Sequence, residues 1–112
     1  MAKVTLQQAV EHSRPGVDGW YYQFPEINNG TTVAYAEFTA EHGQRTIGDR
    51  SRIYYILEGE GEFLLNGETF PITKGDTIAV PPAATYNLWP TNDSTIKVIL
   101  FMELLDVSKL PK

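Results

Sequence analysis

Few side chains in this chain could carry out nucleophilic or metal chemistry. The sequence contains two histidines, His12 and His42, and no cysteine. The lack of cysteine excludes disulfides, zinc–thiolate sites and cysteine nucleophiles. A metal site built from both histidines would need two distant segments to meet, and we do not expect one. His42 lies in a polar segment, where an imidazole can act as a general base. A solvent-exposed loop histidine is the simpler interpretation, because the sequence shows no partner for it.

The elements that must position such residues are strands. From Trp20 onward the chain consists of short runs of β-forming residues separated by turns. Asn66-Gly67 predicts a two-residue hairpin, because both central positions of a type I′ turn need positive φ. Many short strands with regularly spaced turns predict a β-barrel or sandwich. The predicted strands cover residues 20–24, 31–39, 53–57, 62–65, 68–72, 77–80, 85–89 and 96–104.

Composition limits the class of protein. The chain has 112 residues, which suits one domain, and a formal net charge of −5. Its basic residues form no dense run, so we expect no nucleic-acid partner. No apolar run is long enough for a membrane span, and the first residues lack the apolar stretch of a signal peptide, so we expect a cytoplasmic protein with no membrane partner.

Ser13-Arg14-Pro15-Gly16 interrupts the N-terminal segment. We therefore expect an N-terminal arm over residues 1–19, a barrel over 20–105 and a C-terminal tail over 106–112.

Two segments carry a resemblance to a known family. Residues 53–63 (IYYILEGEGEF) and 75–82 (GDTIAVPP) resemble the two signatures of the cupin family, with Gly75 and Pro81 at the family's spacing and Ala83 at a position where the family has glycine. The resemblance implies an all-β fold, the double-stranded β-helix or jelly-roll barrel.

The metal positions of that family are occupied differently in this chain. Counting back from Gly59 places Arg52 at the position of the family's ligand glutamate. The family's histidine positions fall at Thr46 and Gly48, or at Arg45 and Ile47, and its last ligand position falls at Tyr86. Divalent metals need imidazole or carboxylate lone pairs, and a guanidinium stays protonated and repels a cation. We therefore expect neither a metal nor another cofactor in the barrel.

The same alignment predicts which side chains line the interior. If Arg52 takes the orientation of the family's glutamate, strand alternation places Tyr54 and Ile56 on its face. If Tyr86 takes that of the ligand histidine, Leu88 shares its face. The predicted ligand-binding residues are Arg52, Tyr54, Tyr86, Arg45 and Leu88. An arginine can bind a carboxylate with two hydrogen bonds, and phenols can hydrogen-bond to a ligand or stack on a ring.

Each of these residues also has a purely structural interpretation. Arg52 could form a salt bridge to a nearby acid such as Glu37 or Glu62. Tyr54 and Tyr86 could fill the barrel with satisfied hydroxyl groups.

Three functions follow from these residues. The leading hypothesis is a protein that binds a small polar or anionic organic ligand, a carboxylate or sugar-like molecule, without the usual metal. The alternative is a metal-independent enzyme of the sugar epimerase or isomerase type, with His42 and Tyr86 as candidate catalytic residues. The third is an enzyme that holds a metal with unusual ligands such as Glu37, Glu62 and His42.

An apolar outer face predicts a protein partner. Trp89, Ile99 and Phe101 alternate with the presumed inward residues, so we expect them on the outside of the barrel. Such a face on a small protein is usually covered. Either the N-terminal arm or a second subunit could cover it, and we predict a homodimer.

Overall fold

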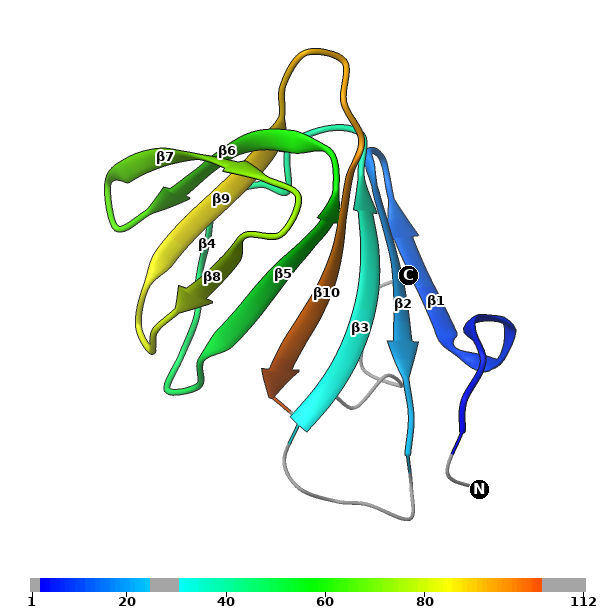
Figure 1. Cartoon of the computed structure of the whole chain (residues 1–112). Helices are drawn as coiled ribbons and strands as arrows, with labels where there is room; N and C mark the ends of the chain where they lie inside the picture. The colour runs from blue at the N-terminus through cyan, green and yellow to red at the C-terminus, as the bar shows by residue number, and fades with distance from the viewer. Residues whose placement is uncertain (1–2, 25–30, 104–112) are drawn as a thin grey trace.

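A computed structural model of the chain describes residues 3–24 and 31–103. In these residues the strands form two antiparallel sheets (Figure 1). The six-stranded sheet has the order β1 (Val10–Arg14), β2 (Val17–Tyr22), β3 (Thr31–Phe38), β10 (Ile96–Glu103), β5 (Arg52–Glu58) and β8 (Thr77–Val80). The four-stranded sheet has the order β4 (Arg45–Thr46), β9 (Thr85–Pro90), β6 (Glu60–Leu65) and β7 (Glu68–Thr73).

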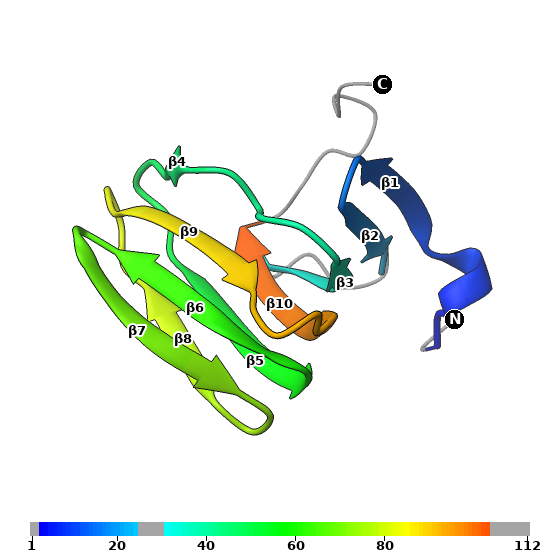
Figure 2. The same cartoon turned by 90° about the horizontal axis from the view of Figure 1, so that it is seen from above.

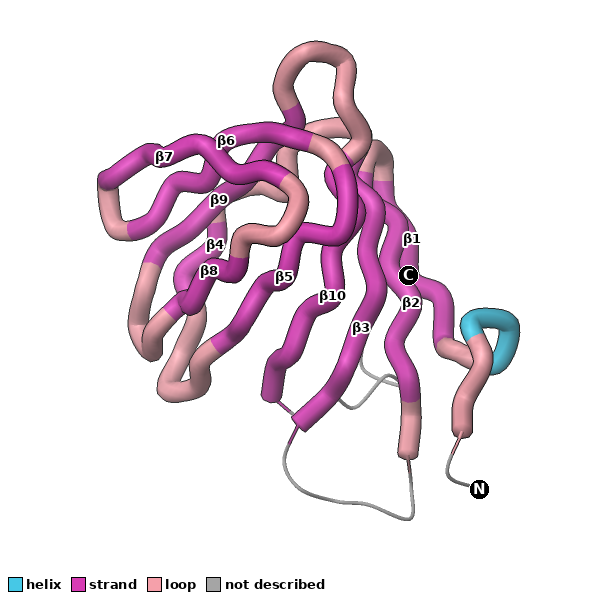
Figure 3. Tube along the Cα trace, in the orientation of Figure 1, coloured by secondary structure: helices cyan, strands magenta, loops and turns pink. Residues whose placement is uncertain are grey.

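The two sheets face each other, with the hydrophobic core between them (Figure 2). Side chains alternate along the strands, so that Ile56 of β5, Phe63 of β6 and Val98 of β10 are fully buried. The described chain is almost entirely strand and loop (Figure 3). Its one helix, the 3-10 turn η1 (Leu6–Gln8), is far too short to cross a membrane, and no other helix occurs in the described residues.

Local turn chemistry sets several strand boundaries. Asn66 and Gly67 have φ values of 49° and 85°, which confirms the hairpin predicted between β6 and β7. Gly59 turns the chain from β5 into β6 with a φ of 92°, and a Cβ there would lie 2.2 Å from the Thr95 carbonyl oxygen. Only glycine meets both conditions without strain.

The N-terminal segment differs from its expected role as an arm. Pro15 and Gly16 form a two-residue turn between β1 and β2, and β2 pairs along its length with β3. Residues 10–19 therefore belong to the six-stranded sheet and do not lie across it. The predicted tail over 106–112 falls outside the described residues.

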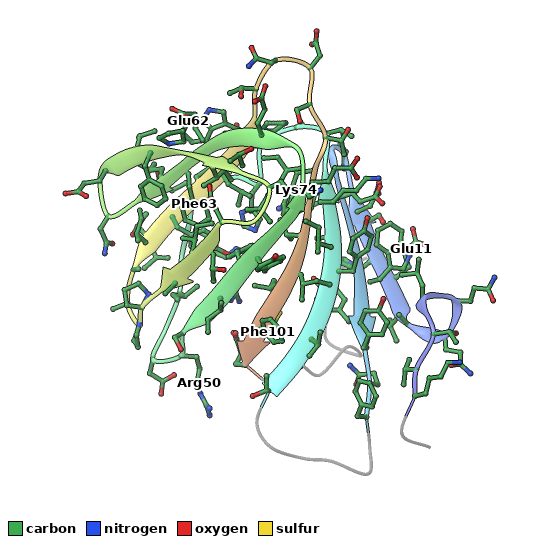
Figure 4. All side chains as sticks on the ribbon, viewed as in Figure 1. Glu11, Arg50, Glu62, Phe63, Lys74 and Phe101 are labelled. Carbon is green, nitrogen blue, oxygen red and sulfur yellow. The ribbon has the colours of Figure 1, made fainter. Side chains whose placement is uncertain are left out.

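The outer face of the six-stranded sheet carries apolar side chains. Of the three residues predicted on the outside of the barrel, Ile99 and Phe101 lie on β10 of this sheet, whereas Trp89 lies on β9 of the other sheet. Ile53, Tyr55, Leu57 and Phe101 are each 38–43% exposed, and Figure 4 shows Phe101 on this face. Among the described residues the N-terminal strands extend this sheet at its edge and do not cover the face. The second subunit expected there stays a prediction.

One backbone position carries strain. Ala83 has a φ of 66°, in the left-handed region, although it has no side chain that favours this conformation. The backbone is held there because the Ala83 N–H donates to the Gly48 carbonyl oxygen at 2.7 Å. This left-handed conformation explains why the family signature has glycine at this position. The chain keeps the conformation with alanine, which costs about 1–2 kcal/mol.

We expect Ala83→Gly to raise the free energy of unfolding by about 0.5–1 kcal/mol, since relief of the strain outweighs the extra flexibility of glycine in the unfolded chain. Ala79→Gly is the matched control, because Ala79 is exposed on β8 in ordinary strand conformation. This substitution should lower the free energy of unfolding by about 0.5–1 kcal/mol. Urea unfolding of both variants measures the difference. Equal destabilisation by the two substitutions would contradict this account.

Candidate functional site

A buried guanidinium lies at the centre of the site. Arg52, the first residue of β5, is only 8% exposed. Its Nε and Nη2 donate to the two carboxylate oxygens of Glu103 on β10, at 3.2 and 3.1 Å, and its Nη1 donates to the Tyr86 hydroxyl at 2.8 Å. Burial by itself lowers the pKa of Arg52, but the hydrogen bonds to Glu103, together with the charges of Tyr86, Tyr54 and Glu103, outweigh burial and raise that pKa above its ordinary value. Arg52 therefore stays charged, with Glu103 as its partner, and the partners suggested from sequence, Glu37 and Glu62, were wrong.

Two tyrosines continue this network. The hydroxyls of Tyr54 and Tyr86 share a hydrogen bond of 2.9 Å, and both side chains are at most 1% exposed. The Tyr86 ring stacks on Phe63 with a centroid separation of 5.9 Å. Burial raises the pKa of Tyr54, so its phenol stays protonated at neutral pH. The hydroxyls of Tyr54 and Tyr86 are thus satisfied inside the barrel, as their structural interpretation requires.

His42 is buried beside Tyr86, although a solvent-exposed loop was the simpler interpretation from the sequence. It is 9% exposed, and its ring lies 5.2 Å from that of Tyr86 and 5.9 Å from that of Phe38. Hydrogen bonds to β9 fix the loop that carries it. The His42 N–H donates to the Leu88 carbonyl oxygen at 2.8 Å, and the Gly43 N–H donates to the Asn87 Oδ1 at 2.9 Å. The structure therefore brings together the His42–Tyr86 pair considered from the sequence.

The hydrogen bonding of His42 fixes which ring nitrogen is free. Nδ1 lies 2.7 Å from the Gly43 carbonyl oxygen, which can only accept, so Nδ1 carries the proton. No buried side-chain nitrogen or oxygen of the described residues lacks a hydrogen-bond partner. Nε2 makes no hydrogen bond in this part of the chain, so it must reach open space. Burial, reinforced by the guanidinium charges of Arg14, Arg45 and Arg52, lowers the pKa of His42 to about 4, and the ring is neutral at pH 7.

His42 is one of the residues that line a cavity of about 230 Å³ in the barrel. The cavity exists partly because Gly19 of β2 and Ala36 of β3, which face each other in register, have little or no side chain. Its apolar wall is formed by Val17, Phe38, Leu100 and Met102, and its polar lining by His12, Arg14, Tyr21, His42, Arg45, Arg52 and Tyr54.

The predicted ligand-binding residues divide into two groups. Arg45, Arg52 and Tyr54 line the cavity. Tyr86 and Leu88 are 0% exposed and are not among the lining residues. Tyr86 therefore acts on the cavity through the side chains it holds, namely Arg52, Tyr54 and His42.

Sequence reasoning missed the contribution of the first hairpin. His12 and Arg14 of β1 and Tyr21 of β2 all line the cavity. The available signal was Pro15-Gly16, a turn dipeptide between two runs of strand length, which we took for a break in an arm. Burial raises the pKa of Tyr21, against the opposing charges of the three cavity arginines.

The side chains at this site do not fit a divalent metal. The positions of the family's glutamate and last histidine hold a guanidinium and a phenol that bind each other. The described residues contain no group of three His, Cys, Asp or Glu side chains that could hold a metal ion. Of the unusual ligands considered, Glu37 accepts from the Tyr35 hydroxyl at 2.8 Å, and Glu62 lies on the outside of the barrel (Figure 4). Neither meets His42, so the structure does not support the third functional hypothesis.

Comparison with known proteins supports the fold. Residues 37–102 match the family model described as "Cupin domain". Uncharacterized protein MJ1618 of Methanocaldococcus jannaschii is 33% identical over 79 residues, which are 67% of this chain and 63% of that protein, so the match spans less than two thirds of the relative's length.

Two solved structures illustrate the similarity. A variant of Streptomyces PAC13 with uridine has a TM-score of 0.78 and 23% identity, and the match covers 92% of this chain and 82% of that one. The same protein is described as a nucleoside dehydratase. A predicted oxalate decarboxylase from Thermotoga maritima has a TM-score of 0.78 and 22% identity, with 92% and 99% coverage. At these identities the likeness establishes the fold, and the predicted jelly-roll barrel is confirmed.

We expect Glu103→Gln to lower the free energy of unfolding by about 1–3 kcal/mol at pH 7, because the buried Arg52 loses its charged partner. Although burial opposes it, the hydrogen bonds from Arg52 hold the pKa of Glu103 below its usual value. The stabilisation is therefore complete above the ordinary glutamate pKa, near 4.5, and is lost as the pH falls through the lower pKa of the folded protein. Urea unfolding between pH 7 and pH 3 should show the free energies of unfolding of the unsubstituted protein and Glu103→Gln becoming equal at the acid end of this range.

Glu58→Gln is the control for this measurement. Glu58 pairs with Lys97 at 3.2 Å, but its side chain is 65% exposed. Glu58→Gln should therefore lower the free energy of unfolding by less than about 0.5 kcal/mol. If Glu103→Gln were as mild as Glu58→Gln at pH 7, the buried ion pair would not have the role assigned to it.

Proposed function

This chain belongs to the cupin family, and we propose that its barrel cavity binds a small polar or anionic organic molecule, of the carboxylate or sugar type, without the metal ion that the family's ligand residues would hold. The observation that carries the proposal is the cavity itself. Its volume of about 230 Å³ corresponds to roughly eight water molecules, which suits one small organic molecule.

The lining of the cavity suits such a ligand. It includes apolar side chains such as Phe38 and Leu100, against which a carbon skeleton can pack. It also includes hydrogen-bonding groups with unused capacity in the described structure. These are Nε2 of His42, which accepts, and the hydroxyl of Tyr21, which can donate or accept. A few convergent polar groups beside an apolar wall are typical of small-molecule sites.

The solved relatives are consistent with this ligand class. PAC13, with the same fold and a TM-score of 0.78, was solved with uridine, which is a sugar linked to a flat ring. We use uridine as a probe for this chain because it combines hydroxyl groups with a ring that can pack on Phe38. At 23% identity the two cavities need not accept the same molecule, so the probe tests the class of ligand and not its identity.

A second function is favoured by one specific observation, the free and neutral Nε2 of His42. Such a nitrogen can remove a proton from a carbon next to a carbonyl group, and the C–H electron pair then forms an enolate. The protonated phenol of Tyr54, which also lines the cavity, can return a proton. This is the acid–base chemistry of a metal-independent sugar epimerase or isomerase. Tyr86, the partner first considered for His42, would orient the two groups and not contact the substrate.

We expect uridine, ribose or ribonate to shift the amide NMR resonances of the cavity residues in a saturable manner. Ala36→Val should weaken this binding at least tenfold, because its two extra methyl groups project into the cavity beside Gly19. The control is Ala79→Val, an identical change on the exposed side of β8, which should alter affinity less than twofold. If all three probes leave the cavity resonances unmoved at tens of millimolar, the proposed function is wrong.

The acid–base function predicts a distinct titration of His42. Because its pKa is lowered to about 4, its ring should stay neutral, with the proton on Nδ1, as the pH falls from 8 to 5. Nitrogen-detected NMR of the imidazole reports both the tautomer and the pKa. In D2O, exchange of the carbon-bound hydrogen beside the carbonyl of ribulose should be constant over that range, fall near pH 4 and vanish in His42→Gln. An imidazole that titrates near pH 6.5 would contradict the effect of burial assigned to His42, and exchange that persists in His42→Gln would rule out the catalytic role.

A further inference from the structure

The arginines of the cavity are not equivalent. Arg52, which we expected from the sequence to bind the ligand, has Nε, Nη1 and Nη2 already engaged by Glu103 and Tyr86. The carboxylate of Glu103 occupies the bidentate edge that an anionic ligand would need, and it neutralises the charge. Arg52 is therefore unsuited to hold an anion, although it lines the cavity.

Arg14 and Arg45 remain available. Both are exposed and both line the cavity, which places them at its mouth, whereas Arg52 and Tyr54 are buried. They approach from different sheets, Arg14 from β1 and Arg45 from β4. Arg14 donates one hydrogen bond to the His42 carbonyl oxygen, which orients its guanidinium and leaves its other donors free. Neither arginine forms an ion pair with any carboxylate in the described part of the chain.

The charge around this mouth is opposite to that of the whole protein. The formal net charge is −5, yet no Asp or Glu occurs among the described residues that line the cavity. Two nearby acids are directed elsewhere, since Glu11 accepts from Ser13 and Glu41 accepts from Asn87. Arg14 and Arg45 also act across the cavity, because their charges oppose ionisation of His42 and favour that of Tyr21. Two uncompensated guanidinium groups facing one cavity form a site that an anion would stabilise.

We propose that Arg14 and Arg45 form an anion subsite at the mouth of the cavity, which binds the phosphate or carboxylate group of the ligand. This inference rests on the proposed function and makes it more specific. The carbon skeleton of the ligand would lie against Phe38 and Leu100, and its far end would reach Nε2 of His42. The first hairpin, through Arg14, thereby determines which ligands are accepted.

The test compares three probes that share a five-carbon skeleton and differ in charge: ribose, ribonate and ribose 5-phosphate. Affinities are measured by NMR titration of the full chain at low salt and again at high salt. We expect ribose 5-phosphate to bind at least tenfold more tightly than ribose. A similar gain with ribonate would show that the subsite accepts a carboxylate as well as a phosphate, and a gain restricted to ribose 5-phosphate would show that it is specific for phosphate.

Arg45→Gln is the decisive variant, because the Arg45 side chain makes no hydrogen bond or ion pair with the described residues, and the backbone pairing of Arg45 with Tyr86 does not depend on that side chain. It should weaken binding of ribose 5-phosphate about tenfold and that of ribose less than twofold. Arg14→Gln should act in the same way. The control is Arg50→Gln. Arg50 is also exposed, but it projects from the end of the barrel, does not line the cavity (Figure 4) and lies 3.9 Å from the carboxylate of Asp49.

The outcomes separate the two proposals. If ribose and the charged probes bind with equal affinity, the anion subsite is wrong while the proposed function stands. If Arg50→Gln weakens ribose 5-phosphate binding as much as Arg45→Gln does, the attraction is a general surface effect and the subsite is again wrong. If none of the three probes binds, the anion subsite is wrong, and the proposed function fails with it when uridine also leaves the cavity resonances unmoved.

Discussion

The hydrogen bonds that the buried guanidinium of Arg52 donates to the Glu103 carboxylate and the Tyr86 hydroxyl organise the interior of this barrel. Arg52 must be neutralised where it lies, and Glu103 does this across adjacent strands. The remaining donor of Arg52 fixes the Tyr86 hydroxyl, and Tyr86 in turn holds Tyr54 and packs against His42. A guanidinium paired with a carboxylate thus occupies the place where the family resemblance positions a metal-binding carboxylate. This network leaves no lone pairs for a metal at the Arg52 and Tyr86 positions. Burial beside Tyr86, with a smaller contribution from Arg52, lowers the pKa of His42 and keeps its imidazole neutral at pH 7.

The cavity depends on a second constraint, the pairing of the first hairpin with β3. That pairing sets Gly19 opposite Ala36, and the small size of both residues leaves space under the hairpin. It also brings His12 and Arg14 over that space. The guanidinium of Arg52 in the interior is therefore paired with a carboxylate, whereas those of Arg14 and Arg45 at the mouth have no carboxylate partner among the described residues. This distribution of charge suits a ligand whose anionic end lies at the mouth and whose neutral polar end lies in the interior.

Much of the fold follows from local sequence. Strand alternation correctly predicted the buried face of Arg52, Tyr54 and Ile56, and Asn66-Gly67 predicted its hairpin, because these features depend on a few neighbouring residues. The site was predicted less completely, because its key contacts join distant segments. Glu103 lies 51 residues from Arg52, and no local pattern selects it over Glu37 or Glu62. The burial of His42 depends on bonds to β9, and the role of Arg14 depends on a hairpin that we interpreted as an arm.

The central claim is that this barrel receives a small organic molecule where related barrels have positions for metal ligands. Its most direct test is X-ray diffraction at the zinc edge from crystals grown with both zinc chloride and ribose 5-phosphate. We predict density for the sugar phosphate inside the cavity, with its phosphate between Arg14 and Arg45, and no anomalous peak beside Arg52. A strong anomalous peak inside the barrel, coordinated by His42 with Arg52 displaced from Glu103, would contradict the account.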